Sequence, residues 1–439
     1  MLRISSLAMA LWFAVSSAFA ATVNNTDATT AAGTNDRNDQ PDLRTLEKRV
    51  ERLEATASAK PAAASSNSFN PDISLILSGL YTNLSQNPAN YRISGFPVPS
   101  SVDIGPGQRG FSLAESELGI YANIDPYFYG GLNYAMHPDD SASVEEAFIQ
   151  TTALSNGVTI KAGRFFSGIG YVNAQHAHVW DFVDAPLAYQ AFLGTQLGDD
   201  GMQIRWLAPT DNFLELGAEL GRGRAFPGSN RDKNGSGAGT LFVHAGGDIG
   251  ISHTWRAGLS TLRTSPQDRE FSDINLAGVD VTNAFSGDTR LWLADAVWKY
   301  APKGNATYTN FKLQAEYLRR QENGSLVYDT AGTANSAAYD AKQSGWYLQS
   351  VYQFMRYWRV GARTEQLDHG RVDYAANNAN LPRTNFNPSK NSVMVDYNPS
   401  EFSRIRLQFA QDKSRQAITD NQVSLQYQMS LGAHGAHQF

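Results

Sequence analysis

The segment QHAHVWDFVD at 175–184 places two histidines and two carboxylates within ten residues. Imidazole nitrogens and carboxylate oxygens are ligands that zinc and other divalent ions accept. His176 and His178 are separated by one residue, and a loop that folds back would bring Asp181 to them. Two interpretations stay open: a metal site made of His176, His178 and Asp181, or polar side chains that line a pore or pack within a loop.

The stretch around this segment, 169–199, is about thirty residues long, and it is apolar and aromatic rather than rich in Gly and Ser. It contains no Lys or Arg. A loop of this composition is expected to bury itself, and inside a barrel the available place is the interior. There it would narrow the pore and set its selectivity.

Basic residues on alternating segments form the other candidate group. In an extended strand, successive side chains point to opposite faces, so the alternate positions that carry polar residues identify the inner face of each segment. On this basis, the wall residues predicted to face the lumen are Arg205, Arg359, Arg363, Arg404 and Arg406. Opposite a loop carrying His176, His178, Asp181 and Asp184, they would create a transverse field that orients dipolar solutes.

Composition argues against several other classes. The chain has no cysteine, which excludes thiolate metal sites and a disulfide scaffold. Its formal net charge of −6 gives no reason to expect nucleic acid. His244 and His253 have no neighbouring nucleophile in a recognisable catalytic pattern, so no enzymatic activity and no cofactor are expected.

The elements that must position these residues are strands. From Asp72 onward, apolar and polar residues alternate, and tight connections alternate with long loops. This is typical of an all-β, sixteen-stranded antiparallel transmembrane barrel with short periplasmic turns. The predicted strands are 72–84, 110–123, 128–137, 143–154, 157–168, 200–208, 212–223, 239–247, 251–263, 288–300, 307–322, 342–354, 357–369, 390–397, 402–413 and 421–439.

The ends of the chain indicate export and assembly. Residues 1–20 have the features of a signal peptide, 21–42 a flexible lead, and 57–71 a small-residue linker before the barrel at 72–439. Between them, 43–56 predicts a short coiled-coil helix with an a/d seam of Leu43, Leu46, Val50 and Leu53. The terminal Phe439 resembles the signal that the outer-membrane assembly machinery reads.

Four segments resemble a known family. VTIKAGRFFSGIG, DDGMQIRW, LQAEYLRR and SGWYLQSVYQF are similar to the phosphate-selective porin O/P group, and the coil resembles that of dicarboxylate-type trimeric porins. The resemblance implies a homotrimer whose third outer loop forms the constriction. That family selects phosphate with clustered basic residues, which 169–199 lacks, so the resemblance does not extend to phosphate specificity.

The expected function is therefore passive diffusion of small hydrophilic solutes or ions through a porin in the outer membrane of a Gram-negative bacterium. The expected partners are lipid, two further copies of the chain, the solutes and the assembly machinery, with the coil in the periplasm. The alternative is a metal-regulated or metal-transporting uptake channel, for zinc or another divalent ion. A closed barrel with a purely structural role is disfavoured by the charges predicted inside.

Overall fold

The computed structural model describes residues 71–432. The expected signal peptide, lead, coil and most of the linker, together with Phe439, lie outside the described residues. The strands, in chain order, are β1 (Asp72–Leu84), β2 (Gly110–Leu113), β3 (Ser116–Asn123), β4 (Phe128–Met136), β5 (Ala142–Thr151), β6 (Val158–Phe166), β7 (Gly198–Leu207), β8 (Phe213–Gly221), β9 (Ala238–Ile249), β10 (His253–Thr264), β11 (Arg269–Ile274), β12 (Asp280–Tyr300), β13 (Asn310–Tyr328), β14 (Asn335–Met355), β15 (Trp358–Asp373), β16 (Ser389–Ser400), β17 (Ser403–Lys413) and β18 (Asp420–Gly432).

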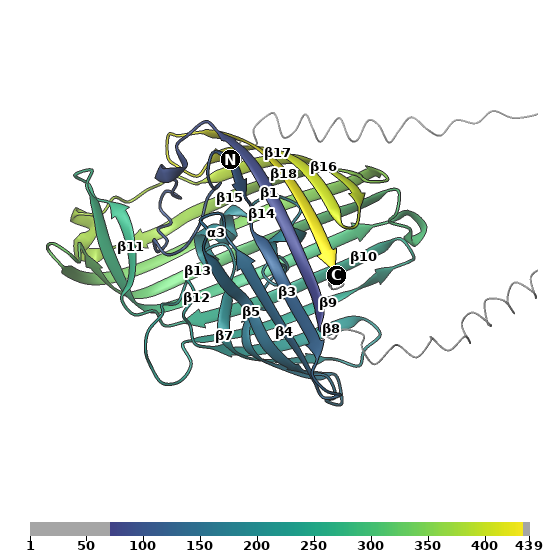
Figure 1. Cartoon of the computed structure of the whole chain (residues 1–439). Helices are drawn as coiled ribbons and strands as arrows, with labels where there is room; N and C mark the ends of the chain where they lie inside the picture. Colours follow the sequence, from purple (N-terminus) through teal and green to yellow (C-terminus); the bar gives the residue numbers. More distant parts are fainter. Residues whose placement is uncertain (1–70, 433–439) are drawn as a thin grey trace, which may run out of the picture. The chain divides into compact units, whose positions relative to one another are not determined.

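The sheet closes on itself. β1 pairs with β18 from Ser74↔Gly432 to Leu84↔Gln422, and its other edge pairs with β2 and β3 (Figure 1). β2 and β3 therefore share one position in the ring, and β11 pairs only with the first part of β12. This leaves sixteen strand positions joined by antiparallel pairs, and the predicted sixteen-stranded barrel is confirmed.

The two faces of the sheet differ as the alternation predicted. On β17, Ile405, Leu407 and Phe409 are 40, 51 and 45% exposed, whereas the intervening Arg406 and Gln408 are 1 and 3% exposed. The same alternation occurs on β18, where Leu425, Tyr427 and Leu431 point outward between inward glutamines and serines. On these strands the barrel has an apolar outer face and a polar inner face.

Four strands are longer than expected. β12, β13, β14 and β15 span 21, 19, 21 and 16 residues, so much of the predicted loops 264–287 and 323–341 is strand (Figure 1). A separate apolar cluster holds this extension together, with Phe285 and Leu326 fully buried at its centre. Its members come from four strands and a loop, so no single segment of the sequence indicated the cluster. The members are Phe271, Val281, Phe285, Leu326, Tyr328, Tyr339, Ala341, Tyr374 and Leu381.

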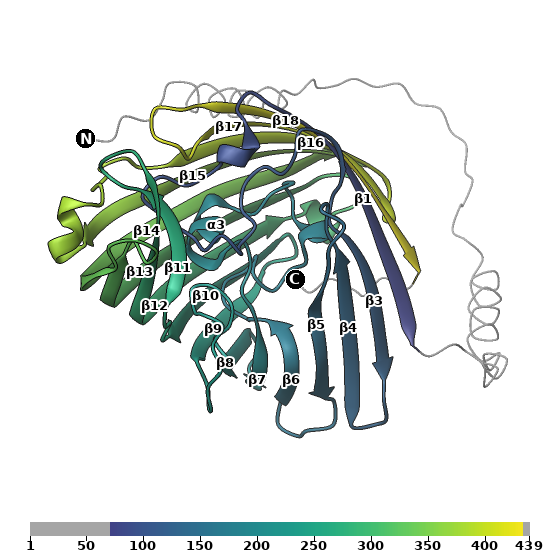
Figure 2. The same ribbon diagram turned by 60° about the vertical axis from the view of Figure 1, so that its left-hand side comes forward.

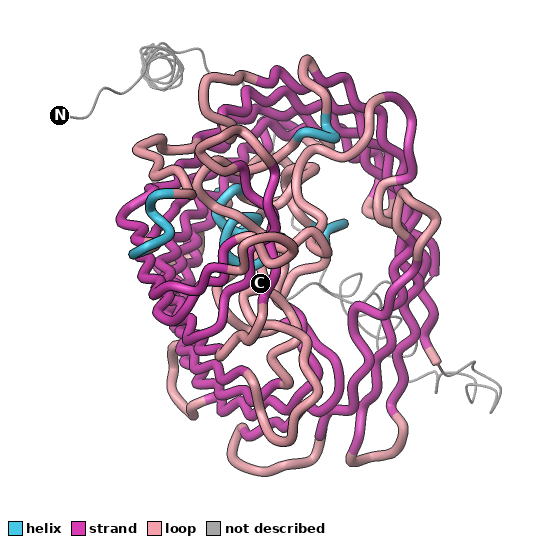
Figure 3. The backbone as a smooth tube through the Cα atoms, turned by 90° about the vertical axis from the view of Figure 1, so that its left-hand side faces the viewer, coloured by secondary structure: helices cyan, strands magenta, loops and turns pink. Residues whose placement is uncertain are grey.

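Helical structure is scarce in the described part of the chain. The one α-helix there, α3 (Leu187–Leu193), lies inside the ring of strands (Figures 2 and 3). The other helical segments are single 3-10 turns: η1 (Pro88–Asn90), η2 (Ala177–Val179), η3 (Pro302–Gly304) and η4 (Ala375–Ala379). Within residues 71–432, no helix is long and apolar enough to cross a membrane.

Candidate functional site

The connection between β6 and β7, residues 167–197, is called here the inner loop, and it carries α3. All seven residues of α3 are buried, and six of them are aliphatic or aromatic. The exception, Gln190, donates a hydrogen bond to the carbonyl oxygen of Ala185 at 2.8 Å. α3 packs against β13, β14 and β15 from inside the barrel. Leu318 on β13 and Leu367 on β15 form one buried apolar cluster with residues of α3. The helix ends at Gly194, whose φ of 65° is the left-handed conformation that favours glycine.

Wall carboxylates accept hydrogen bonds from the inner-loop backbone. Glu365 accepts from the N–H of Leu187 at 2.5 Å, which satisfies a free donor at the start of α3. Glu316 accepts from the N–H groups of Tyr171 and Val172 at 3.2 and 3.1 Å. A loop buried inside a barrel needs such partners, because unpaired backbone groups away from water are costly.

The two loop aspartates form ion pairs with the wall. Asp181 contacts Lys312 and Arg359. Burial opposes its ionisation, but these cations outweigh burial and hold the pKa of Asp181 well below its usual range.

Asp184 is held in the same manner. Its carboxylate lies 2.9 Å from Arg363 and 2.7 Å from Lys390, and it accepts a hydrogen bond from the Gln408 amide at 2.9 Å. Burial would raise its pKa, but Arg363 and Lys390 lower it well below the usual value. Both loop aspartates therefore remain ionised at neutral and mildly acidic pH.

Arg404 and Arg406 also bind the inner loop, through its backbone. Both donate to the carbonyl oxygen of Trp180, at 3.0 and 2.9 Å, and Arg404 also donates to the carbonyl of His178. The sequence predicted an acidic loop facing a basic wall, and in the structure Arg359, Arg363, Arg404 and Arg406 contact the loop directly. Four of the five predicted wall arginines fix the loop in place.

Arg205, the fifth predicted wall arginine, is separate from the loop. It lies 3.5 Å from Glu215 and 3.4 Å from the Gln150 amide oxygen, and 22% of its side chain stays exposed. It belongs to a set of basic residues that face inward within four residues of the short turns. The set is called here the basic belt: Lys161, Arg205, Arg256, Lys299, Lys312, Arg359 and Arg404.

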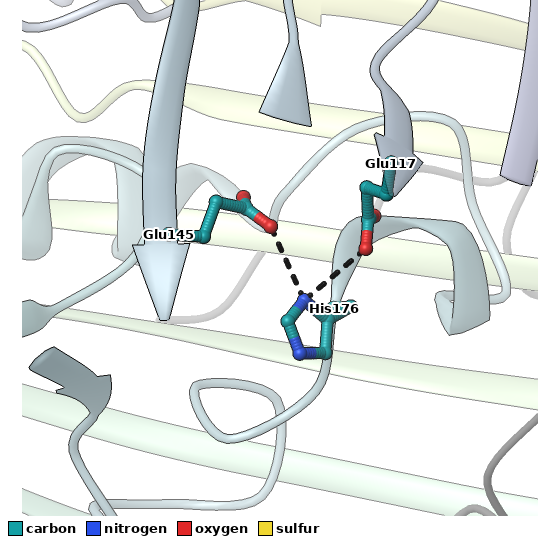
Figure 4. Close-up of side chains that lie close together, drawn as sticks. All are labelled: Glu117, Glu145 and His176. Carbon is teal, nitrogen blue, oxygen red and sulfur yellow. Dashed lines mark hydrogen bonds and ion pairs between the residues drawn. The ribbon is translucent and has the colours of Figure 1, made fainter. Parts of the chain in front are cut away.

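The opposite side of the inner loop carries the two histidines. Nδ1 of His176 lies 3.3 Å from Glu117 on β3 and 3.2 Å from Glu145 on β5, as Figure 4 shows. Nε2 of His176 lies 3.1 Å from Glu146, and Nδ1 of His178 lies 2.8 Å from Glu117. Burial lowers the pKa of His176, but hydrogen bonds to the two β5 glutamates and the charge of Glu117 raise it well above 6.5.

A β-bulge allows Glu145 and Glu146 to reach the same histidine. Asn133 pairs with Glu146 and Tyr134 pairs with Val144, so Glu145 is an extra residue on β5. In a regular strand, consecutive side chains point to opposite faces, but a bulge re-aims one of them. Both glutamates therefore point into the barrel.

The structure brings His176 and His178 together but separates them from Asp181. Their rings stack with centroids 5.7 Å apart, whereas Asp181 is paired with Lys312 and Arg359. The histidines contact Glu117, Glu145 and Glu146 instead, which sequence reasoning did not select. The adjacent glutamates on an otherwise alternating strand were the available signal.

No family model matches the chain. An uncharacterised protein of Aquifex aeolicus (strain VF5) is 31% identical over 428 residues, which cover 91% of this chain and 86% of that protein. The chain belongs to the same family.

Several solved structures of outer-membrane proteins are similar to this chain. The anion-selective porin from Comamonas acidovorans matches with a TM-score of 0.50 at 10% identity, over 82% of this chain and 99% of that one. The outer-membrane channel DcaP of Acinetobacter baumannii matches with a TM-score of 0.49 at 13% identity, over 82% and 97% of the two chains. At 10% identity the likeness to the Comamonas porin bears on the fold alone, and it agrees with the sixteen-stranded barrel of this chain. The resemblance to the phosphate-selective O/P group stays a prediction.

Replacing Asp184 tests how firmly the inner loop is fastened. Asp184→Asn would remove the counter-charge shared by Arg363 and Lys390, which are 3 and 1% exposed. Among the described residues, Arg363 would keep only Glu365, and Lys390 only Asp412, as an ion-pair partner. Removing one partner of a buried ion pair costs about 3–5 kcal/mol, and we expect the free energy of unfolding in lipid vesicles to fall by that amount. Arg371→Gln, which removes an exposed pair with Asp373, is the control and should change it by less than about 1 kcal/mol. Equal effects of the two substitutions would contradict this account.

Proposed function

We propose that this protein is an outer-membrane porin that lets small hydrophilic solutes diffuse passively across the membrane, with a preference for anions. The observation that carries the proposal is the closed ring of strands with apolar side chains outside and charged side chains inside. Lipid requires that every backbone polar group be paired within the protein, and a closed sheet meets this requirement. A charged inner face is what a water-filled pathway needs.

The outer face supports a membrane location. Mid-strand residues such as Leu407, Leu425 and Tyr427 are 51, 46 and 48% exposed on the outer face of the barrel. A soluble protein rarely exposes a contiguous apolar surface of this extent, and bulk lipid would cover it. The short connections between strands are the expected periplasmic turns, and the long loops the expected outer ones.

The basic belt supports the anion preference. Among the described residues, its members Arg205, Arg256, Lys312 and Arg359 form ion pairs with Glu215, Asp295, Asp181 and Asp396. Several of these side chains remain partly exposed, with Arg205 at 22% and Lys312 at 20%. A basic constriction in a low-dielectric wall concentrates anions and repels cations.

The inner loop supports a narrow, selective pathway. It crosses from the β10–β18 side, where it is bound through Asp181 and Asp184, to the β3–β5 side, where it is bound through His176 and His178. We propose that these residues and the wall arginines set the size and charge limits for solutes. The homotrimer, the periplasmic coil, the signal peptide and the assembly role of Phe439 belong to the same proposal.

The first test is single-channel conductance of the purified protein in a planar bilayer under a salt gradient. We expect open currents in steps of three and a reversal potential of the sign that anion preference requires. Lys161→Gln with Arg205→Gln removes two belt charges that do not contact the inner loop, and it should shift the reversal potential toward the cation side. Arg263→Gln removes an outward-facing arginine from β10 and should leave it unchanged. Silence of the wild-type protein would overturn the channel proposal.

A matched pair of substitutions tests the membrane location. Leu407→Arg places a charge at the middle of β17 on the apolar face, and we expect it to reduce stability in lipid vesicles by about 2–4 kcal/mol. Leu276→Arg makes the same chemical change at a loop position that is 61% exposed, and it should cost within about 0.5 kcal/mol. If Leu407→Arg is as mild as Leu276→Arg, the outer face does not contact lipid.

A further inference from the structure

On the histidine-bearing side of the inner loop, three glutamates gather around two imidazoles. Among the described residues, the ion pairs of Glu117, Glu145 and Glu146 are all with histidine, and none is with Lys or Arg. The side chains of these glutamates are 2, 12 and 13% exposed. Elsewhere in the barrel, the buried carboxylates of Asp184, Asp396 and Glu365 have a permanent cation beside them, whereas Glu316 and Glu219 are held by hydrogen bonds from neutral groups. Three buried carboxylates that share two imidazoles leave excess negative charge, which is costly unless a cation joins them.

The hydrogen-bond roles of His176 point to where such a cation would bind. An ionised carboxylate only accepts, so Nε2 of His176 donates its hydrogen to Glu146 at 3.1 Å. In a neutral imidazole the other nitrogen, Nδ1, then carries a lone pair, and it faces oxygens of Glu117 and Glu145 at 3.3 and 3.2 Å. Three acceptor atoms that converge on one point form a ligand set for a metal ion.

The distances between these atoms suit that ion. Nδ1 of His176 and the nearest oxygens of Glu117 and Glu145 all lie within 4.8 Å of one another (Figure 4). Ligands held tetrahedrally at about 2.0–2.1 Å from zinc are themselves roughly 3.3–3.4 Å apart. The two separations from Nδ1 are close to this value, so an ion could enter with only small side-chain movements.

A buried amide adds a second, independent indication. Asn133 is 2% exposed, and its Nδ2 lies 2.9 Å from Glu117 and 3.0 Å from Nδ1 of His176. Its Oδ1 is buried without a hydrogen-bond partner among the described residues. Turning the amide over would place this oxygen beside the same ligand atoms, where it would be repelled in an empty site and would serve as a fourth ligand in an occupied one.

We propose that Glu117, Glu145 and His176 bind a divalent cation of the zinc class, with Asn133 available as a fourth ligand. Glu146 orients the imidazole by accepting from Nε2, and His178 orients Glu117 by donating to its other oxygen at 2.8 Å. Metal-bound histidines in proteins usually have such an acceptor behind them. The ion would bind His176, on the inner loop, to Glu117 on β3 and Glu145 on β5. This role goes beyond solute passage and does not require the ion to cross the membrane.

The experiment is a zinc titration of the purified full-length protein in detergent, after treatment with EDTA, in competition with a chromophoric chelator. We expect one zinc ion per chain. His176→Gln should weaken binding at least 100-fold, and Glu146→Gln, which removes only the acceptor behind the imidazole, by about 10–100-fold. Replacing zinc with Co²⁺ should produce the visible absorption of a tetrahedral site, and this absorption should disappear in Glu145→Gln. Heat-dependent migration of each variant in gels checks that the barrel is folded.

The control is His244→Gln. His244 forms a single pair with Glu215 at 3.2 Å and has no second carboxylate at the same nitrogen, so its replacement should leave zinc affinity unchanged. Absence of binding, or binding that His176→Gln leaves intact, would overturn the proposal and identify the cluster as an imidazolium held by carboxylates. Conductance of the EDTA-treated protein separates this outcome from the porin proposal, because a channel that conducts without binding zinc contradicts only the metal site.

Discussion

Closure of the sheet through the β1–β18 pair is the constraint on which the other features depend. Once the ring is closed, each strand has one face turned outward and one turned inward, so the period of two decides every side chain's surroundings. The inward side chains converge on a limited space, and the inner loop fills part of it. The buried ion pairs of the lumen follow from this geometry, because a loop in that space must bring its carboxylates and backbone against charged walls.

The inner loop is fastened differently on its two sides. Toward the β10–β18 wall, it offers aspartates and backbone carbonyls to guanidinium and ammonium groups, whose charges are permanent at physiological pH. Toward the β3–β5 wall, it offers imidazoles to glutamates, and an imidazole can carry a proton or bind a metal in its place. Only the second side can respond to the composition of the surrounding solution, and any regulation of the pathway through its fastening would act there.

Much of the fold could be predicted from the sequence, because it depends on local alternation. The strand order, the count of sixteen and the inward direction of Arg363, Arg406 and Gln408 all follow from the period of two. The apolar cluster around Phe285 could not be predicted, because it joins strand ends that are distant in the chain. The bulge at Glu145 was not predicted either, although the adjacent polar residues Glu145 and Glu146 interrupt the alternation there.

The alternation of side chains along a strand does not predict which partners the charged residues contact. The alternation along a strand identifies the face on which Arg359 or Arg404 lies, but not the position of its side chain along the barrel axis. That position decides whether the side chain contacts the inner loop or water.

The absence of Lys and Arg from 169–199 has a clear physical meaning. The wall already supplies the cations, so a basic loop would have placed like charges together inside a low-dielectric space. An acidic and imidazole-bearing loop instead neutralises only the wall charges it reaches, such as those of Arg363 and Lys390. Arg205, which lies away from the loop, pairs instead with Glu215 and keeps 22% of its side chain exposed.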